Sequence, residues 1–434
     1  MNEKFKRRIK DFFSVSKLSV LIYWLIIIAL LGLFFTNDFG LVDIHKTAII
    51  TAVGIDAEEG EVIVTCEVAV PQPSQSGDNI KYTQIQGSGL TIADALNEVN
   101  SKTGFYPKLQ FCKLILVGED CQNQELFRML GCFYRKNYSE LTALVAMCKG
   151  KASDMLAMSS PVSDMTSEAI TKSLSEEIEK SANAASVSLK DIAMREFSKS
   201  GACYMPFVEA NVPGTSENGG NGDNVGGEEG GSGGGQGGSQ GGSGSQGGEG
   251  GECQTGASGQ SNQGGGQMEF TARKTAIFSG GKFKGLLSPQ QTFALSMIED
   301  EIRLAVLPCD ADGIHYTMGM KNIDCGIKLN VENGTPKATL SFKAKAQIQG
   351  AKVPVDPRTT ANDDIIPENI LKGAENEMEK RFSELIEVIR TTDCDLLGLR
   401  EKLFKYNTKY FETFKDDVLT RMEVEYKIDV QSVN

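Results

Sequence analysis

The stretch TAIITAVGIDAEEGEVIVTCEVAVP, residues 47–71, decides the first element of the fold. Both ends of this stretch are rich in β-branched residues, and the polar AEEG at 57–60 separates them, which predicts two strands joined by a turn. In the second strand the apolar side chains recur at every other position and therefore share one face. The residues on that face are Val62, Val64, Cys66, Val68 and Val70. The stretch predicts a hairpin with one buried face.

Helices and strands alternate after this hairpin. A helix is predicted over 91–104, because Thr91 can accept a hydrogen bond from the backbone N–H of Asp94 as an N-cap residue. Further elements are strands at 111–120 and 141–150 and helices at 123–136 and 167–182, the last of them exposed. The order β-β-α-β-α-β-α predicts an α/β layer in which helices cover a mixed sheet.

The C-terminal part has a different pattern. Its elements are a hairpin at 274–288 with its turn at Ser279–Gly281, a helix at 289–302, antiparallel strands over 313–350, a helix at 367–391 and a strand at 421–430. The long helix carries an apolar stripe at three- and four-residue steps, formed by Leu371, Ala374, Met378, Phe382, Leu385 and Ile389. This part is expected to be α+β, with an antiparallel sheet and the long helix on one face.

Residues 214–267 interrupt these two patterns. The segment is rich in Gly, Ser and Gln and has almost no apolar side chains, so it cannot bury a core. Either it links two independent domains or it is inserted into one fold. The expected domains are a basic segment 1–17, an anchor 18–35, an α/β domain 42–213, this segment, and an α+β region 268–434 that could divide into 268–305 and 306–434.

The apolar run at 18–35 predicts an uncleaved transmembrane helix. At ~1.5 Å per residue it spans ~27 Å, close to the ~30 Å of a hydrocarbon core. Neither a small-residue cleavage site nor a lipoprotein cysteine follows it, and the six basic residues before it place the N-terminus in the cytoplasm and residues 37–434 outside. The expected anchor residues are Leu18, Leu21, Trp24, Leu25, Ile28, Leu31 and Phe35. The predicted architecture is thus a multi-domain ectodomain of α/β plus α+β type, with mixed and antiparallel sheets covered by helices, behind one membrane helix.

Composition limits the function classes. The net charge is −13, and the part beyond the basic N-terminus is more acidic still, which argues against nucleic acid and anionic lipid headgroups as partners. The chain has ten cysteines but no C-x-x-C pair, so a zinc ribbon is not expected. Most of these cysteines are expected to be free, buried thiols, with Cys253 exposed.

No pattern in the sequence predicts catalysis, a cofactor or a metal. The two histidines, His45 and His315, have no carboxylate or cysteine at ligand spacing, and each is interpreted as structural or exposed. Two weak motifs have simpler explanations: GSGLTI at 87–92 is interpreted as a turn before a capped helix, and CDADG at 309–313 as a tight turn because a calcium-binding loop would need a glutamate further on. We therefore predict no catalytic, cofactor-binding or metal-binding residue.

Several stretches together resemble a known family. They are VDIHKTAIITAVGID at 42–56, GLTIADALNEVNSKTGFYPKLQFCKLILVGED at 89–120, ALVAMCKGKASDML at 143–156, TAIFSGGKFKGLLSPQQT at 275–292 and TDCDLLGL at 392–399. In this order they are similar to the C subunits of spore germinant receptors, the Ger(x)C family. The resemblance covers residues 42–213 and 269–434.

The resemblance implies a role in spore germination. Members of this family are ectodomains at the outer face of the spore inner membrane, and they work with a transporter-like permease and a larger membrane-embedded subunit. The resemblance implies several α/β and α+β domains and a non-enzymatic subunit of a nutrient germinant receptor. This chain departs from the family in its uncleaved helix, in its glycine-rich segment, and at Phe111 or Cys112, where the family has a histidine.

Two other functions fit the anchor and the linker. One is a membrane-tethered cell-envelope hydrolase, which would need a catalytic cluster that the sequence does not display. The other is a structural envelope or adhesion protein, which would explain the linker but not the ordered motifs. Expression confined to the forespore would distinguish the receptor subunit from both.

Overall fold

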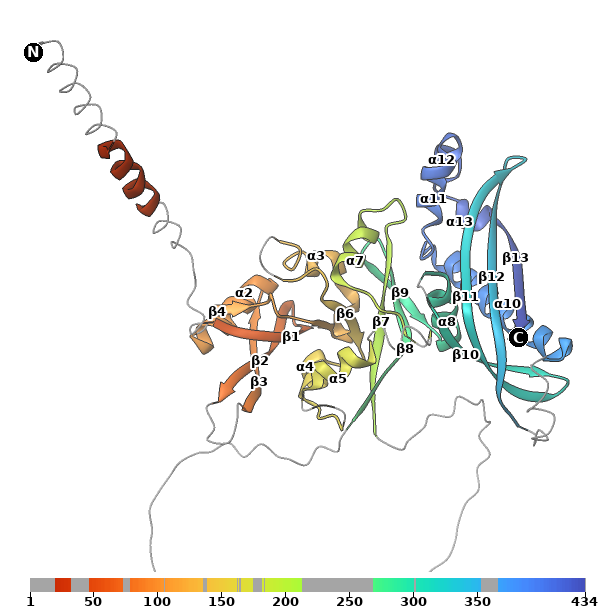
Figure 1. The fold of residues 1–434 in the computed structure, drawn as a ribbon, viewed down its shortest axis with the longest axis horizontal. Helices are drawn as coiled ribbons and strands as arrows, with labels where there is room; N and C mark the ends of the chain where they lie inside the picture. The colour runs from red at the N-terminus through yellow and green to blue at the C-terminus, as the bar shows by residue number, and fades with distance from the viewer. Residues whose placement is uncertain are drawn as a thin grey trace, which may run out of the picture.

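Two β-sheets, each covered by helices, make up the folded part of the chain (Figure 1). The structure is a computed structural model. It describes residues 20–32, 47–72, 79–104, 106–135, 139–161, 163, 165–174, 182, 184–212, 268–299, 302–352 and 366–433. The predicted fold class is confirmed as mixed α/β with two sheets and helices.

The first sheet has nine strands in the order β3-β2-β1-β5-β6-β7-β8-β9, with β4 paired to β1. Its central pairs, β1–β5, β5–β6 and β6–β7, are parallel, whereas β1–β2, β2–β3, β7–β8 and β8–β9 are antiparallel. The expected hairpin at 47–71 is thus the β1–β2 pair of a mixed sheet. The strands are β1 Thr47–Glu58, β2 Glu61–Gln72, β3 Asn79–Gly89, β4 Tyr106–Lys108, β5 Leu114–Val117, β6 Leu144–Cys148, β7 Ala202–Asn211, β8 Glu269–Ser279 and β9 Lys282–Leu287.

Helices cover both faces of this sheet, so its central strands are buried on both sides. In β5, Ile115 and Val117 belong to one core cluster and Leu114 and Leu116 to another. This is why the strand reads as a continuous apolar run. The covering elements are α2 Ile92–Thr103, the 3-10 turn η2 Glu119–Asn123, α3 Leu126–Leu130, α4 Ala152–Ala157, α5 Thr166–Ser173 and α7 Leu189–Glu196.

Two of these helices differ from expectation. Helix α3 ends at Leu130, earlier than predicted, and Gly131 follows it. Helix α5 is not fully exposed, because Thr166, Ser167, Ala169 and Ile170 are buried. The remainder of its predicted range lies largely outside the described residues.

Helix α2 begins as its sequence predicts. The side chain of Thr91 accepts a hydrogen bond from the N–H of Asp94 at 3.2 Å. The preceding glycines allow the helix to pack closely on β3, since a Cβ at Gly87 would lie 2.2 Å from the carbonyl oxygen of Ala95. GSGLTI was predicted to be a turn before a capped helix; the capped helix is confirmed, but Gly87–Gly89 is the end of β3 and the chain bends only at Leu90 and Thr91.

The second sheet has the order β10-β11-β12-β13. The strands β10 Leu304–Ala311, β11 Ile314–Glu332 and β12 Thr335–Ala351 are antiparallel, as predicted, but β13 Glu423–Ser432 runs parallel to β12. The expectation of a purely antiparallel sheet was wrong here, because helices cross over between β12 and β13 and bring the chain back in the same direction. The helices of this part are α8 Pro289–Glu299, α10 Glu368–Thr392, α11 Leu399–Tyr406, α12 Thr408–Phe414 and α13 Val418–Arg421.

The long helix α10 packs its apolar stripe against this sheet. Ala374, Met378 and Phe382 are fully buried, and the Phe382 ring lies 5.9 Å from that of Phe342 on β12. Leu371, which was predicted to belong to the stripe, is only partly buried. The helix–sheet contact therefore follows the periodicity of the sequence.

The segment 214–267 joins neighbouring strands of one sheet. Strand β7, before it, pairs antiparallel with β8, after it, and the register runs from Ala202↔Ser279 to Asn211↔Glu269. Strand β9 then extends the same sheet. The strands on either side of 214–267 are therefore neighbours in the sheet.

The N-terminal helix is described over residues 20–32. Of the expected anchor residues, Leu21, Trp24, Leu25, Ile28 and Leu31 lie on it with exposed side chains, whereas Leu18 and Phe35 lie outside the described residues. Within the part of the chain that the structure describes, no helix meets the length and hydropathy needed to cross a membrane.

Nine of the cysteines are described, and all nine are free. Seven of these are buried, which raises the pKa of their thiols through desolvation, as at Cys112, where it is about 12. Cys253 lies outside the described residues. The expectation of free, mostly buried thiols is confirmed for these nine.

Candidate functional site

A cleft of about 760 Å³ lies where the two sheets and their helices meet. One wall comes from α7 and β7, and the other comes from the segment after α10 together with α11. The sequence analysis proposed no site here. A signal was present in the aromatic run FKYNTKYF at 404–411, because aromatic side chains are enriched at the centres of interfaces.

Arg195 on α7 connects the two parts at the floor of the cleft. Its Nη2 lies 2.6 Å from Oε2 of Glu299 at the end of α8 and 3.1 Å from the hydroxyl of Tyr204 on β7. Its Nη1 donates to the carbonyl of Leu396 at 3.0 Å. Burial opposes the charge of this guanidinium, but Tyr204 and Glu299 raise its pKa, so Arg195 stays charged.

Asp395 forms the next part of the floor. Its side chain is fully buried, and its two oxygens accept from the N–H groups of Leu399 and Arg400, each at 2.8 Å. Gly398 adopts φ 63° between them, a conformation that glycine takes easily. The segment TDCDLLGL is therefore a turn that caps α11.

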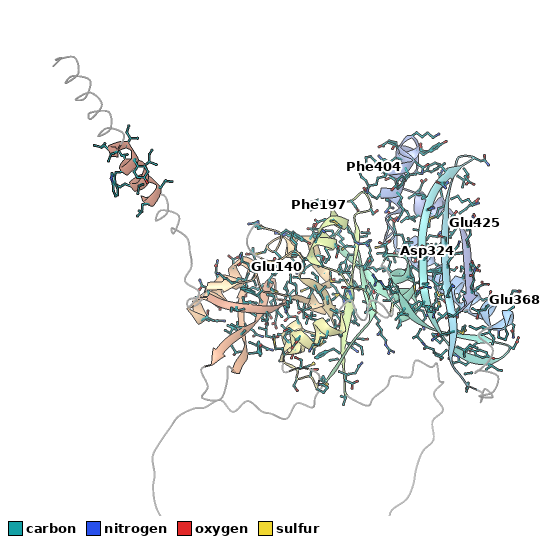
Figure 2. All side chains as sticks on the ribbon, viewed as in Figure 1. Glu140, Phe197, Asp324, Glu368, Phe404 and Glu425 are labelled. Carbon is teal, nitrogen blue, oxygen red and sulfur yellow. The ribbon has the colours of Figure 1, made fainter. Side chains whose placement is uncertain are left out.

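The rim of the cleft differs from its floor. Three large apolar side chains of the lining are exposed there: Phe197 at 83%, Tyr406 at 77% and Met194 at 58%. Figure 2 labels Phe197 and Phe404 at this edge of the molecule. Lys405, which is also exposed, lines the cleft and pairs with Glu401 at 3.2 Å, whereas Lys199 lies in the neighbouring hollow. Lys199 lies over the Phe404 ring, with Nζ 5.1 Å from its centroid.

The carboxylates of the cleft are already engaged. Asp191 caps α7 with Ser188, and Glu299 pairs with Arg195 at 2.6 Å. Glu401 accepts from the backbone N–H of Lys199 at 2.9 Å, and this bond lowers the pKa of its carboxyl with a further contribution from Lys405. Each acid thus stabilises the local structure.

The cleft has no histidine among its lining residues. Ser198 donates to the carbonyl of Arg195. Among the described residues, no group of three or more His, Cys, Asp or Glu is arranged to hold a metal ion. Nothing in the described lining combines a nucleophile with a base.

His315 has a partner that the sequence analysis missed. Asp310 faces it across the β10–β11 pair, and Nδ1 of His315 lies 2.8 Å from Oδ1 of Asp310. Both side chains are largely exposed, so the pair is a surface contact. The turn between them contains Asp312 and Gly313, at φ 50° and 76°, which confirms that CDADG forms a tight turn. His45 lies outside the described residues.

The motif ending in Asp56 is a second buried carboxylate site. Its oxygens accept from the backbone N–H groups of Ala152 at 2.6 Å and Ser153 at 2.9 Å, where α4 begins. A Cβ at Gly118 would lie 2.2 Å from Oδ1 of Asp56, so a glycine is needed there. Burial raises the pKa of Asp56. The motif therefore joins β1, the end of β5 and α4.

Comparisons with known proteins agree with the motifs. Residues 41–210 match the family model of the spore germination protein N-terminal domain, and residues 273–433 match the model described as spore germination B3/GerAC like, C-terminal. No curated protein matches the chain. A solved structure, the crystal structure of the GerBC protein, is similar at 15% identity with a TM-score of 0.49, over 88% of this chain and 97% of that one. The two family models together span both folded parts, and the chain belongs to the GerAC-like family of spore germination proteins, the C subunits of spore germinant receptors.

Proposed function

We propose that this protein is a non-enzymatic subunit of a nutrient germinant receptor that acts by docking on membrane partners. The observation that carries the proposal is the match of both folded parts, residues 41–210 and 273–433, to germination-protein families. The cleft supports it, because the carboxylates there cap helices or form ion pairs. The partners implied are a transporter-like permease and a larger membrane-embedded subunit.

The proposal includes a membrane anchor at residues 18–35. The support is the uncharged apolar run of the sequence, the basic residues before it, and the exposed apolar side chains over 20–32. With the N-terminus in the cytoplasm, the folded part would lie outside the spore inner membrane. The shared membrane would raise the effective concentration of the partners, so a modest interface suffices.

The domain division is also a proposal. We propose one unit for the first sheet and its helices, with 214–267 as an insert between β7 and β8, and a second unit for the second sheet. The support is the β7–β8 pairing and the contact of α8 with both parts. The boundary would then follow β9 rather than residue 213.

A deletion strain tests the function. Sporulation should be normal, and the spores should fail to germinate with one class of nutrient while still germinating through routes that bypass receptors. Normal germination with every nutrient, in a background without a redundant receptor, would contradict the proposal. A hydrolase would instead predict a germination defect that a catalytically dead side-chain variant reproduces.

A further inference from the structure

One edge of the first sheet combines the start of the folded chain with exposed apolar side chains. Strands β4 and β5 run parallel to β1, and β6 runs parallel to β5, so the first residues of these strands lie at the same edge. The chain enters β1 at this edge, at Thr47. We call it the entry edge. It comprises the segments before β5 and β6, residues 108–113 and 139–143, and the start of α7 at 188–191, which is hydrogen-bonded to 139–143.

Phe111 and Leu141 are large apolar side chains exposed on the entry edge. Phe111 is 56% exposed and Leu141 is 46% exposed. Leu109 pairs with Ser139 in the same register in which β5 pairs with β6, so Phe111 and Leu141 occupy matching positions on neighbouring segments. A contact that removes both from water would be favourable in proportion to the apolar area that it covers.

The length of the chain before Thr47 decides which edge can meet a membrane. Residues 36–46 separate the proposed anchor from β1, and a chain of this length reaches at most ~40 Å when it is fully extended. Strand β1 itself runs for ~36 Å from Thr47 to Glu58. An anchored chain could bring the opposite edge to the bilayer only if 36–46 ran back along the whole strand. The entry edge is the one next to the anchor.

Charge distinguishes the same two edges. The opposite edge, which we call the far edge, consists of 58–61, 118–123 and 149–151, after β1, β5 and β6. It has five acids and two lysines: Glu58, Glu59, Glu61, Glu119, Asp120, Lys149 and Lys151. The entry edge has three lysines and two acids: Lys108, Lys113, Lys190, Glu140 and Asp191.

The entry edge can therefore approach lipid headgroups without an excess of acid. Asp191 accepts hydrogen bonds from Ser188 in the cap of α7. Glu168 of α5, whose carboxyl pKa Lys113 helps to lower, forms an ion pair with Lys172 at 3.2 Å. The chain as a whole has a net charge of −13, and anionic headgroups repel an acidic surface. Of the two edges, the entry edge is the one that can rest on a bilayer.

Anchoring makes a small contact sufficient. A single exposed apolar residue is ordinary on a protein surface, and two such residues would bind a free protein to lipid only weakly. The anchor would hold the entry edge beside the bilayer at high effective concentration, so a weak contact is occupied. Apolar side chains of this kind are buried ~5–10 Å into the boundary between headgroups and acyl chains.

We propose that the entry edge rests on the lipid bilayer that holds the anchor. Phe111 and Leu141 insert into the headgroup region, and Lys108, Lys113 and Lys190 lie near the lipid phosphates. The contact orients the ectodomain so that the acidic far edge points away from the membrane. This inference rests on the proposed function, because it requires the anchor at 18–35.

Photo-crosslinking of the purified full-length chain in vesicles of phosphatidylcholine and phosphatidylglycerol tests the inference. Benzoylphenylalanine replaces Phe111 or, in a second variant, Leu141. The matched control carries the probe in place of Leu90, which is 77% exposed and follows β3 at the end where Gly89 pairs with Val62, beside the far edge. We expect both entry-edge probes to form adducts with lipid, detected by mass spectrometry. Their yield should be about tenfold above that of the control, which corresponds to ~1.4 kcal/mol.

A serine substitution tests whether the two apolar side chains act together. In the chain with the probe at Phe111, Leu141→Ser should lower the yield of lipid adduct, because it removes one of the two inserted side chains. Leu90→Ser in the same chain should leave the yield unchanged. Both substituted positions are exposed, so neither change should disturb the fold.

Several outcomes would overturn the inference. They are a yield from the Leu90 probe equal to that of the entry-edge probes, no lipid adduct from either entry-edge probe, adducts with another part of the chain in place of lipid, or the same loss of yield in both serine variants.

Trp24 separates this failure from a failure of the anchor. It is the single tryptophan of the chain, and bromine atoms on the acyl chains should quench its emission if the anchor is inserted. If Trp24 is quenched while the entry-edge probes give no lipid adduct, only the docking edge is wrong. If Trp24 is not quenched, the proposed anchor is wrong, and this inference is wrong with it.

Discussion

The two parts of the chain each use a buried aspartate to cap a helix, but they do so over different distances. Asp56 on β1 accepts from Ala152 and Ser153, almost a hundred residues later in the chain. Asp395 accepts from Leu399 and Arg400, within the next turn. Both side chains are buried, and Asp395 also belongs to the lining of the cleft.

The two caps therefore have different structural roles. The Asp56 motif holds distant elements together, and changing it disturbs the sheet and α4 at once. The Asp395 turn holds α11, whose residues Lys405 and Tyr406 line the cleft. The residues that resemble the family most clearly therefore shape the fold.

The largest effect should come from Asp56→Ala. The change leaves the N–H groups of Ala152 and Ser153 without an acceptor in a buried place, at a cost of about 3 kcal/mol. The thermal midpoint of the full-length protein in detergent should fall by several degrees. Asp56→Asn keeps the shape and one acceptor, so its midpoint should lie between those of Asp56→Ala and wild type. If both variants had the midpoint of wild type, Asp56 would not stabilise the contact between β1 and α4.

Asp395→Ala should also be destabilising, by about 2 kcal/mol, because it leaves the N–H groups of Leu399 and Arg400 without their acceptor in a buried place. Its distinctive effect should be on α11: hydrogen exchange should accelerate at Leu399 and Arg400 while α4 stays protected. If α4 and α11 lost protection equally, the effect of the Asp395 cap would not be confined to α11, and the proposed difference between the two caps would be wrong.

A third buried carboxylate, Glu67, should make the stability of the protein depend on pH. Glu67 is 3% exposed, and it accepts from the Ser167 hydroxyl at 3.0 Å through Oε1, while Oε2 has no partner among the described residues. Burial raises the pKa of Glu67 above its ordinary 4.5. Above pH 4.5 the unfolded chain releases this proton before the folded protein does, so stability falls as pH rises towards the folded pKa.

Glu67→Gln should remove this penalty. The midpoint of the variant should exceed that of wild type, with a gap that is small below pH 4.5 and grows as pH rises, as a series of thermal melts would measure. A gap of constant size would indicate that packing, and not ionisation, separates the two proteins.

Local patterns predicted much of the fold. The period of α10, the cap at Thr91 and the glycine turn before β9 are encoded within a few residues, so the sequence was sufficient for them. The parallel β12–β13 pair and the β7–β8 pair across 214–267 depend on where distant elements return, which no local pattern reveals. The cleft was missed for the same reason, since Arg195, Glu299 and Asp395 meet only in three dimensions.

The smallest effect should come from shortening 214–267 to a brief Gly-Ser loop. Each halving of a flexible loop changes the closure free energy by only ~0.6 kcal/mol, so the midpoint should stay nearly unchanged. A loss of several degrees on shortening would show that the segment packs on one of the two parts.

His315→Ala should also leave the thermal midpoint nearly unchanged, because the pair of His315 with Asp310 is exposed.

Co-purification of the full-length protein from spore membranes tests the central claim most directly. A tagged chain, extracted in mild detergent and analysed by mass spectrometry, should bring down a transporter-like permease and a larger membrane-embedded protein in stable proportion. An untagged strain, taken through the same purification, should yield neither membrane protein. A wild-type chain recovered without any membrane partner would contradict the account.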